Sequence, residues 1–414
     1  MFPRKLGGRR HGDFLQRGAG RRQGLATCVP RGVIGTPGMA AAQRGLGCGL
    51  WCGTGIDRCS MRFSVRILWS ARMKVFFSKA DGYADASYVF PFARSILTYL
   101  ADVGIEVTDT PDTGETIALG VQWDPPLEVV QNLHARGIPF VHRLDGRARS
   151  VIKLYDKDEE NRRINLLADW TVFQSEYVRR HTCRTVETIF GPEPPVCLHP
   201  EKGSVIYNGV DRSIFREDGP REPLKGDFNI LHVAFTHGIR KGVGDLVAMA
   251  RLLEGNPQIH FYTIGRQEQD IAHGHLLTGL RNVTHLGVIV DRQRLAQIMR
   301  SAQALFFPSR DDYCPNTVLE AMSCGLPVWY HASGGTPELV RTKEIVAGVA
   351  MMPENPVYPL HVLREHHAEF RERAIEMVER RFTLRHMGDA YIALFERLER
   401  QAVESGRVGA RERS

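Results

Sequence analysis

From residue 73 onward, short apolar runs alternate with longer stretches in which apolar positions recur every three or four residues. The short runs are typical of buried parallel strands, and the longer stretches are typical of amphipathic helices. In the first half of this region we expect strands at 75–77, 105–107, 117–121, 139–144, 171–173 and 204–207, with helices at 91–103, 127–136 and 161–168. Such alternation predicts a parallel sheet with helices on both faces.

The pattern restarts after a turn-rich stretch, 209–227, which holds three glycines and two prolines and is interpreted as a linker. It separates a first domain, 73–208, from a second, 228–383. In the second domain we expect strands at 230–235, 259–264, 283–286, 304–307 and 349–352, with helices at 243–253, 292–301 and 316–324. Two more helices, 362–381 and 384–401, should follow before a frayed tail at 403–414. The predicted fold class is therefore α/β with two Rossmann-like domains.

Most of the candidate chemistry lies in one segment, residues 304–340. An apolar run ends there at Pro308, and a predicted helix begins at Asn316. The amides of a first helical turn form an anion site, so a phosphate could dock against Asn316, Thr317 and Val318. The segment therefore joins the end of a strand to a phosphate-binding helix start.

Two acids lie in the same segment, Asp312 in the loop and Glu320 in the helix. A carboxylate at a helix start can simply balance the helix dipole. Glu320 lies between Leu319 and Ala321 in an otherwise apolar helix, where an acid is rarely left without a partner. Hydroxyls of a sugar or a ribose would be suitable partners.

Several ordered motifs resemble those of one known family. The spacing Asp312-x7-Glu320, the run EAMSCGLPV at 320–328 and the turn GGTPE at 334–338 look like the donor-site signature of the glycogen-synthase-like retaining glycosyltransferases. Further matches are YNGVD at 207–211 followed by Phe215, RKG at 240–242 and QSE at 174–176. The resemblance covers about residues 73–401. The family normally has glutamate where this chain has Asp312.

The resemblance implies the GT-B architecture, in which two Rossmann-like domains face each other across a cleft and a last helix, here 384–402, crosses back to the first domain. It also implies that Lys241 holds the donor diphosphate, that Asp312 binds hydroxyls of the transferred sugar, and that Glu320 binds the ribose. Glycines at a turn permit close backbone approach to a ligand. The other implied donor-binding residues are Gly334, Gly335, Gly265, Arg240, Asn316, Thr317 and Val318. The alternative for Lys241 is a solvated loop lysine, and the alternative for Gly334 and Gly335 is a plain strand-to-helix turn.

The family usually has a second cation, an arginine five or six residues before the lysine. This chain has Phe235 and Thr236 there. Arg240 or His237 would have to replace the missing charge.

In the first domain, the run HRLDG at 142–146 ends a predicted strand. The resemblance places a histidine facing the acceptor near this point, and Asp145 comes closest in register. Asp145 could orient the acceptor hydroxyl or stabilise positive charge that develops on the sugar. Asp145 capping the turn at Gly146 is an equally good interpretation. His142 is expected to be a hydrogen-bonded core histidine.

Net charge is unevenly distributed. Among residues 1–72 there are 13 Lys and Arg against Asp13 and Asp57, a net charge of +11, so the total of +7 leaves −4 on the remaining residues. A nucleic-acid partner argued from total charge would therefore concern only this leader, and we expect none for the folded body. We expect residues 1–72 to be disordered, or to precede a true start at Met61 or Met73, with a transit peptide as the alternative.

No metal or cofactor is expected. The acids of Asp156-Lys157-Asp158 run on into a predicted helix start, where acids are common, and Asp311-Asp312 lacks the intervening residue of a metal-binding Asp-x-Asp pair. In the leader, Cys48 and Cys52 lack the second ligand pair of a zinc site. The body cysteines, Cys183, Cys197, Cys314 and Cys324, have no paired spacing and are expected to be reduced thiols.

The sequence thus predicts a cytoplasmic, metal-independent, retaining glycosyltransferase of polysaccharide biosynthesis. It would move a sugar from a nucleotide-diphosphate donor to a hydroxyl of a glycan or lipid-linked acceptor. Peripheral association with the inner face of a membrane stays open, because no apolar run approaches the ~20 residues that span a bilayer. The alternatives are a nucleotide-sugar epimerase on the same fold and a non-catalytic sugar-nucleotide binding protein.

Overall fold

The computed structural model describes residues 73–78, 91–148, 157–188, 191–266 and 279–407. The predictions for residues 1–72, for Asp156 and for the end of the tail at 408–414 lie outside these ranges.

The first sheet has six parallel strands in the order β2-β1-β3-β4-β5-β8. Both β3 and β4 are buried at every residue, as expected for central strands covered on both faces. The strands are β1 Lys74–Phe77, β2 Glu106–Thr108, β3 Ile117–Val121, β4 Phe140–Leu144, β5 Trp170–Phe173 and β8 Gly203–Val205. The predicted parallel sheet is confirmed.

The helices of the first half are α3 Pro91–Asp102, α4 Leu127–Ala135, α6 Lys157–Asn165 and α7 Glu176–Thr182. The prediction for α6 was wrong at its start, which comes four residues earlier than Asn161 because three acids occupy its first turn, where they balance the helix dipole. Two further features were not predicted from the sequence: α7, and the antiparallel hairpin of β6 Val186–Thr188 and β7 Gly191–Glu193. A short 3-10 helix, η1 Pro200–Lys202, precedes β8.

The second sheet also has six parallel strands, in the order β11-β10-β9-β12-β13-β14. They are β9 Phe228–Thr236, β10 Ile259–Arg266, β11 Val283–His285, β12 Ala304–Phe307, β13 Val328–Tyr330 and β14 Gly348–Ala350. The elements between them are η2 Ile239–Lys241, α8 Val243–Leu252, α9 Arg292–Ser301, α10 Asn316–Ser323 and α11 Thr336–Val340. The strand 304–307 and the helix that begins at Asn316 are therefore confirmed.

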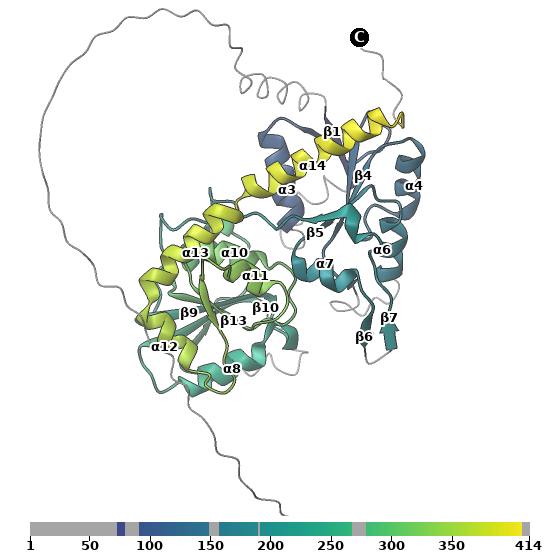
Figure 1. The fold of residues 1–414 in the computed structure, drawn as a ribbon. Helices are drawn as coiled ribbons and strands as arrows, with labels where there is room; N and C mark the ends of the chain where they lie inside the picture. Colours follow the sequence, from purple (N-terminus) through teal and green to yellow (C-terminus); the bar gives the residue numbers. More distant parts are fainter. Residues whose placement is uncertain (1–72, 79–90, 149–156, 189–190, 267–278, 408–414) are drawn as a thin grey trace, which may run out of the picture. The chain divides into compact units, whose positions relative to one another are not determined.

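Three helices close the described chain, where two were expected: α12 Tyr358–Glu365, α13 His367–Arg381 and α14 Leu384–Glu404. Pro359 in the first turn begins α12 early, and a break at His366 separates it from α13. Helix α14 lies beside α3 (Figure 1), and its buried Tyr391, Phe395 and Leu398 belong to the core of the first half. The predicted apolar stripe of the last helix thus packs on the first domain.

None of the helices in the described ranges combines the length and the apolarity that a bilayer crossing requires.

Candidate functional site

Two neighbouring strands of the second sheet carry the acid and the cation singled out above. Lys241 ends η2, which follows β9, and Asp312 lies in the loop after β12. Lys241 Nζ and Asp312 Oδ2 are 2.6 Å apart, and Ser309 Oγ donates to the same oxygen over 3.0 Å. Both side chains remain partly exposed, at 39% and 19%. The carboxyl ends of two adjacent strands, where ligands of open α/β sheets bind, therefore meet in one ion pair.

Backbone contacts hold these two loops together. Gly242 has φ of 70°, and a Cβ there would lie 2.6 Å from Pro308, so the position requires glycine. The amide of Arg310 donates to the carbonyl of Arg240 over 2.9 Å. The Arg310 guanidinium also forms two bonds to Asp245, the shorter of 2.6 Å. These contacts hold the two loops that carry Lys241 and Asp312 in a fixed position relative to each other.

The predicted glycine turn serves the Asp312 loop directly. Gly334 has φ of 68°, and the amide of Gly335 donates to the carbonyl of Asp312 over 2.7 Å. A Cβ on Gly335 would lie only 1.9 Å from the carbonyl oxygen of Tyr313. Both glycines are thus needed for close packing of backbone on backbone, and their contact with a donor stays a prediction.

Glu320 has a protein partner that the sequence analysis did not select. Arg292, at the start of α9, places Nη2 3.3 Å from Glu320 Oε1. Burial raises the pKa of Glu320 to about 7, and the charges of Arg292 and Arg94 oppose that rise. Glu320 is paired with Arg292 through one oxygen, so its second oxygen can still accept a hydrogen bond from a hydroxyl.

The other predicted donor-binding residues differ in side-chain exposure and in whether their amides are already hydrogen-bonded. Asn316 and Thr317 are partly exposed at the start of α10, whereas the Val318 side chain is buried in the core and its amide donates to Pro315 over 3.1 Å. Gly265 has φ of 138° and donates its amide to Gly287 over 2.9 Å. Of these four residues, Asn316 and Thr317 therefore keep partly exposed side chains for a ligand.

His237 does not supply the missing second cation. Its side chain is fully buried, and burial together with the charges of His232 and His285 lowers its pKa to about 3. The ring is neutral at physiological pH, so the structure contradicts this alternative. Arg240 is exposed beside Lys241, and its role as the second cation stays a prediction.

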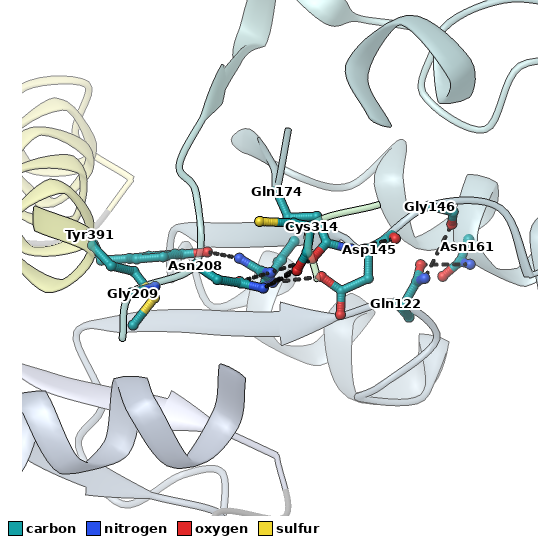
Figure 2. A network of polar contacts seen from close by, with 11 residues as sticks. Gln122, Asp145, Gly146, Asn161, Gln174, Asn208, Gly209, Cys314 and Tyr391 are labelled. Carbon is teal, nitrogen blue, oxygen red and sulfur yellow. Dashed lines mark hydrogen bonds and ion pairs between the residues drawn. The ribbon is translucent and has the colours of Figure 1, made fainter. Parts of the chain in front are cut away.

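In the first domain, Asp145 is held by a buried arginine. Arg143 donates from Nε to Asp145 Oδ1 over 2.7 Å and from Nη2 to Asn208 Oδ1 over 2.7 Å. Its Nη1 donates to the hydroxyl of Tyr391 over 3.1 Å, which ties the group to α14. Figure 2 shows Asp145, Gln174, Asn208 and Tyr391 converging from four different segments. Sequence reasoning missed Arg143, although an arginine inside an apolar strand signals a buried, paired charge.

This network borders a cavity of about 80 Å³ that gathers residues from distant segments. Asn208 Nδ2 also donates to the carbonyl of Cys314 over 3.0 Å, so the network reaches the loop before α10. The polar lining consists of Arg143, Asp145, Gln174, Asn208 and Asn316, and the apolar lining of Phe77, Pro91, Phe92, Ala93 and Val121. The fold therefore brings two predicted site residues, Asp145 and Asn316, to one cavity.

Glu338, the acid of the GGTPE motif, binds the start of a helix in the first half of the chain. Its carboxylate accepts the amides of Glu176 and Tyr177, over 2.8 and 2.7 Å, in the first turn of α7. The hydroxyl of Tyr207 donates to it over 3.0 Å. A carboxylate at a helix start is stabilised by the free amides and the dipole. The matched motifs QSE, YNGVD and GGTPE thus meet at one carboxylate.

His142 is the core histidine that was expected. Its Nε2 donates to the carbonyl of Gln122 over 2.7 Å, and its Nδ1 accepts from Asn165 over 3.1 Å. Burial lowers its pKa to about 4, which keeps the ring neutral.

Within the described ranges, no three His, Cys, Asp or Glu side chains are grouped as metal ligands would be. Asp158 Oδ1 accepts the amide of Ala148 over 2.7 Å. Independence from a metal stays a prediction.

The second domain matches a known protein family. Residues 227–358, which contain Lys241, Asp312 and Glu320, match the family model described as glycosyl transferases group 1. A search of the curated proteins with the whole sequence finds no match.

Solved structures extend the likeness to both sheets. Sucrose-phosphate synthase from Thermosynechococcus elongatus is 20% identical, with a TM-score of 0.52 over 71% of this chain and 75% of that one. HepE from Anabaena, in complex with UDP, is 18% identical, with a TM-score of 0.53 over 78% of this chain and 100% of that one. The apo lipopolysaccharide outer core galactosyltransferase WaaB is 16% identical, with a TM-score of 0.54 over the same two shares. These likenesses establish the GT-B fold, as predicted.

Proposed function

We propose that the protein is a retaining glycosyltransferase that moves a sugar from a nucleotide-diphosphate donor to a hydroxyl of a glycan or a lipid-linked acceptor. The observation that carries the proposal is the contact between Lys241 and Asp312, at the carboxyl ends of adjacent strands, inside the domain that matches the family. The UDP in the complex of HepE makes uridine nucleotides the first donors to try. A cytoplasmic location stays a prediction.

In this proposal Lys241 exchanges its carboxylate partner for the donor diphosphate. Two unit charges about 4 Å apart interact by ~4 kcal/mol at an effective dielectric of 20, and less where solvent reaches both groups. A diphosphate carries more negative charge than one carboxylate, so it competes favourably for the lysine. Asp312, only partly exposed, is then released to accept hydrogen bonds from hydroxyls of the sugar.

The transfer itself needs one bond to break and one to form. The bond between the anomeric carbon and the diphosphate oxygen breaks, the acceptor oxygen bonds to that carbon from the same face, and the acceptor proton passes to the departing diphosphate. Positive charge develops on the sugar during this step, and Asp145, held by Arg143 and 29% exposed, would stabilise it. Glu320 would hold the ribose with the oxygen that Arg292 leaves available.

The test follows the fate of the donor. The purified protein is incubated with UDP-sugars, and release of UDP is measured with and without a mixture of glycan and lipid-linked acceptors. UDP release that depends on the acceptor supports transfer. Release of UDP and free sugar without acceptor would indicate the epimerase alternative, and binding without release would indicate a non-catalytic protein.

A matched pair of lysine variants tests the site. Lys241→Ala should lower acceptor-dependent UDP release at least 100-fold, because the charge that holds the diphosphate is lost. Lys343→Ala removes an exposed lysine of the same domain and should leave the rate unchanged. Equal rates in the two variants would show that the donor site has been placed wrongly.

A further inference from the structure

One side chain of the Asp312 loop leaves the second domain and packs on the first. The hydroxyl of Tyr313, the residue after Asp312, donates to the carbonyl of Arg147 over 3.0 Å. The tyrosine ring lies on Gly146, where a Cβ would be only 2.3 Å from the ring, so this turn accepts the ring because it carries glycine. Gly146 directly follows Asp145. The residue next to the candidate donor acid therefore contacts the residue next to the candidate acceptor acid.

First-domain side chains enclose the Tyr313 ring. Tyr177 and His181 of α7 lie beside it, with ring centroids 6.1 and 6.5 Å from its own. Aromatic rings at such separations attract each other in offset or tilted arrangements. Tyr313 is buried, and the other buried members of its apolar cluster are Leu144, Phe173, Val178, Val196 and Cys197. The ring is thus part of the core of the first domain, although the loop that carries it belongs to the second.

The backbone of the same residue holds the Asp312 carboxylate. The amide of Tyr313 donates to Asp312 Oδ1 over 3.1 Å. The other oxygen, Oδ2, faces Lys241 and Ser309. The carbonyl of Asp312 accepts the amide of Gly335 over 2.7 Å. When a donor diphosphate takes Lys241 away from Oδ2, the contact of Oδ1 with the Tyr313 amide remains, so the direction of the carboxylate still follows the position of Tyr313.

The next residue of the loop makes a second connection to the first domain. The carbonyl of Cys314 accepts a hydrogen bond from Asn208 Nδ2 over 3.0 Å. Asn208 Oδ1 in turn accepts from Arg143, and Arg143 donates to Asp145 (Figure 2). Two consecutive residues thus lead to Asp145, Tyr313 through the turn that follows it and Cys314 through the network around its carboxylate. One link would leave the loop free to rotate about it, whereas two links define an orientation.

We propose that Tyr313 is a positioning residue that holds the Asp312 carboxylate at a set distance and direction from Asp145. This role rests on the proposed function, in which Asp312 binds hydroxyls of the transferred sugar and Asp145 stabilises the charge that develops on it. Both acids must meet the same sugar, and a misplacement of about 1 Å can cost ~100-fold in rate. Tyr313 acts through Asp312 and need not touch either substrate.

This role determines which measured quantity depends on Tyr313. In the proposed function UDP is bound by Lys241, Glu320 and the start of α10, so its affinity should not depend on the tyrosine ring. The transfer rate should depend on the ring, because the ring determines where Asp312 meets the sugar. A residue that only stabilised the fold would instead lower the number of folded sites and leave the rate of each site unchanged.

The test uses the full chain and separates binding from turnover. Calorimetry with UDP gives the affinity and the number of sites, and acceptor-dependent UDP release at saturating UDP-sugar gives kcat per site. Tyr313→Ala should lower kcat about 100-fold and leave UDP affinity and site number unchanged. Tyr313→Phe, which loses the hydrogen bond to Arg147 and keeps the ring, should lower kcat about threefold to tenfold. Tyr358→Ala removes an exposed tyrosine of the same domain and should change none of the three values.

The outcomes distinguish this role from the proposed function. A native kcat per site in Tyr313→Ala would overturn the role of Tyr313 and leave the proposed function intact, even if the number of UDP sites fell. If Tyr313→Ala does not fold, Tyr313→Phe decides alone, and a native kcat in that variant would contradict the role. The proposed function fails separately, when the native protein shows no acceptor-dependent UDP release, and the role of Tyr313 would then fail with it.

Discussion

Each of the two sheets places an acid and a cation at the ends of its strands, but the two pairs are built differently. In the second domain, Lys241 and Asp312 come from two different strand ends, and both are partly exposed. In the first domain, Arg143 is fully buried inside one strand, while its acid, Asp145, is 29% exposed. The comparison teaches that an exchangeable ion pair can release its cation to a ligand, whereas a buried arginine holds its acid in place.

Three buried histidines should make both domains sensitive to acid, the second more than the first. Burial lowers the pKa of His142 in the first domain and of His232 in the second to about 4, and that of His237 to about 3. Unfolded histidine titrates near 6.5, so stability is complete above pH 6.5 and is lost as the pH falls toward 4, because the unfolded chain binds protons that the folded chain does not. His142 and His232 should each cost ~3 kcal/mol in total and His237 ~5 kcal/mol, since one pKa unit corresponds to 1.36 kcal/mol.

This expectation is checked by urea unfolding between pH 7.5 and 4.5, with tryptophan emission and hydrogen exchange by segment. The second domain, which holds two of the three rings, should lose protection first. His142→Gln should flatten the pH dependence of the first domain alone. Equal loss of protection in both domains would contradict the greater acid sensitivity expected of the second domain.

Arg143→Met should destabilise the fold by about 3–5 kcal/mol, as breaking a buried charge network does. Asn208, Gln174 and Tyr391 all lose the donor that satisfies them, and the cation that stands 3.7 Å above the ring of Phe92 is lost. The measurement is the free energy of unfolding in urea. Arg310→Met removes an arginine whose pair with Asp245 is more exposed, and it should cost at most ~1 kcal/mol. Similar costs for the two variants would contradict the structural role of Arg143.

Glu320→Gln should change how stability depends on pH. The pKa of Glu320 is raised to about 7 by burial, so its contribution is fully present below pH 4.5 and is lost as the pH rises through 7. The native protein should therefore lose up to ~3 kcal/mol between pH 4.5 and 7.5 relative to the variant, since the shift is about 2.5 units. Thermal unfolding over that range measures the difference. Parallel curves for the two proteins would show that Glu320 titrates normally.

Lys241→Met should have the smallest effect on stability and a clear effect on ligand binding. A partly exposed ion pair contributes ~1 kcal/mol or less to folding. The loss of the diphosphate contact should nevertheless weaken UDP binding at least tenfold, measured by calorimetry. A large loss of stability with unchanged UDP affinity would reverse the contrast between the two pairs.

Much of the architecture could be predicted from the sequence because it rests on local patterns. The strand 304–307, the helix that starts at Asn316 and the apolar stripe of α14 follow from periodicity and from proline at helix starts. The helix α7 and its hairpin could not be predicted in this way, because the short strands of the hairpin have almost no apolar alternation and α7 is anchored by Glu338, far away in the sequence.

For the candidate site, the sequence by itself determined which residue types are present and which loops carry them: Lys241 after one strand, Asp312 after another, and glycines where φ must be positive. Only the tertiary structure decided how these groups are paired. It set Asp312 on Lys241, Glu320 on Arg292, and Arg143 beneath Asp145. The physical reason is that ion pairs and hydrogen bonds act over a few ångströms, and those distances are created by strand order and packing between segments that the sequence keeps apart.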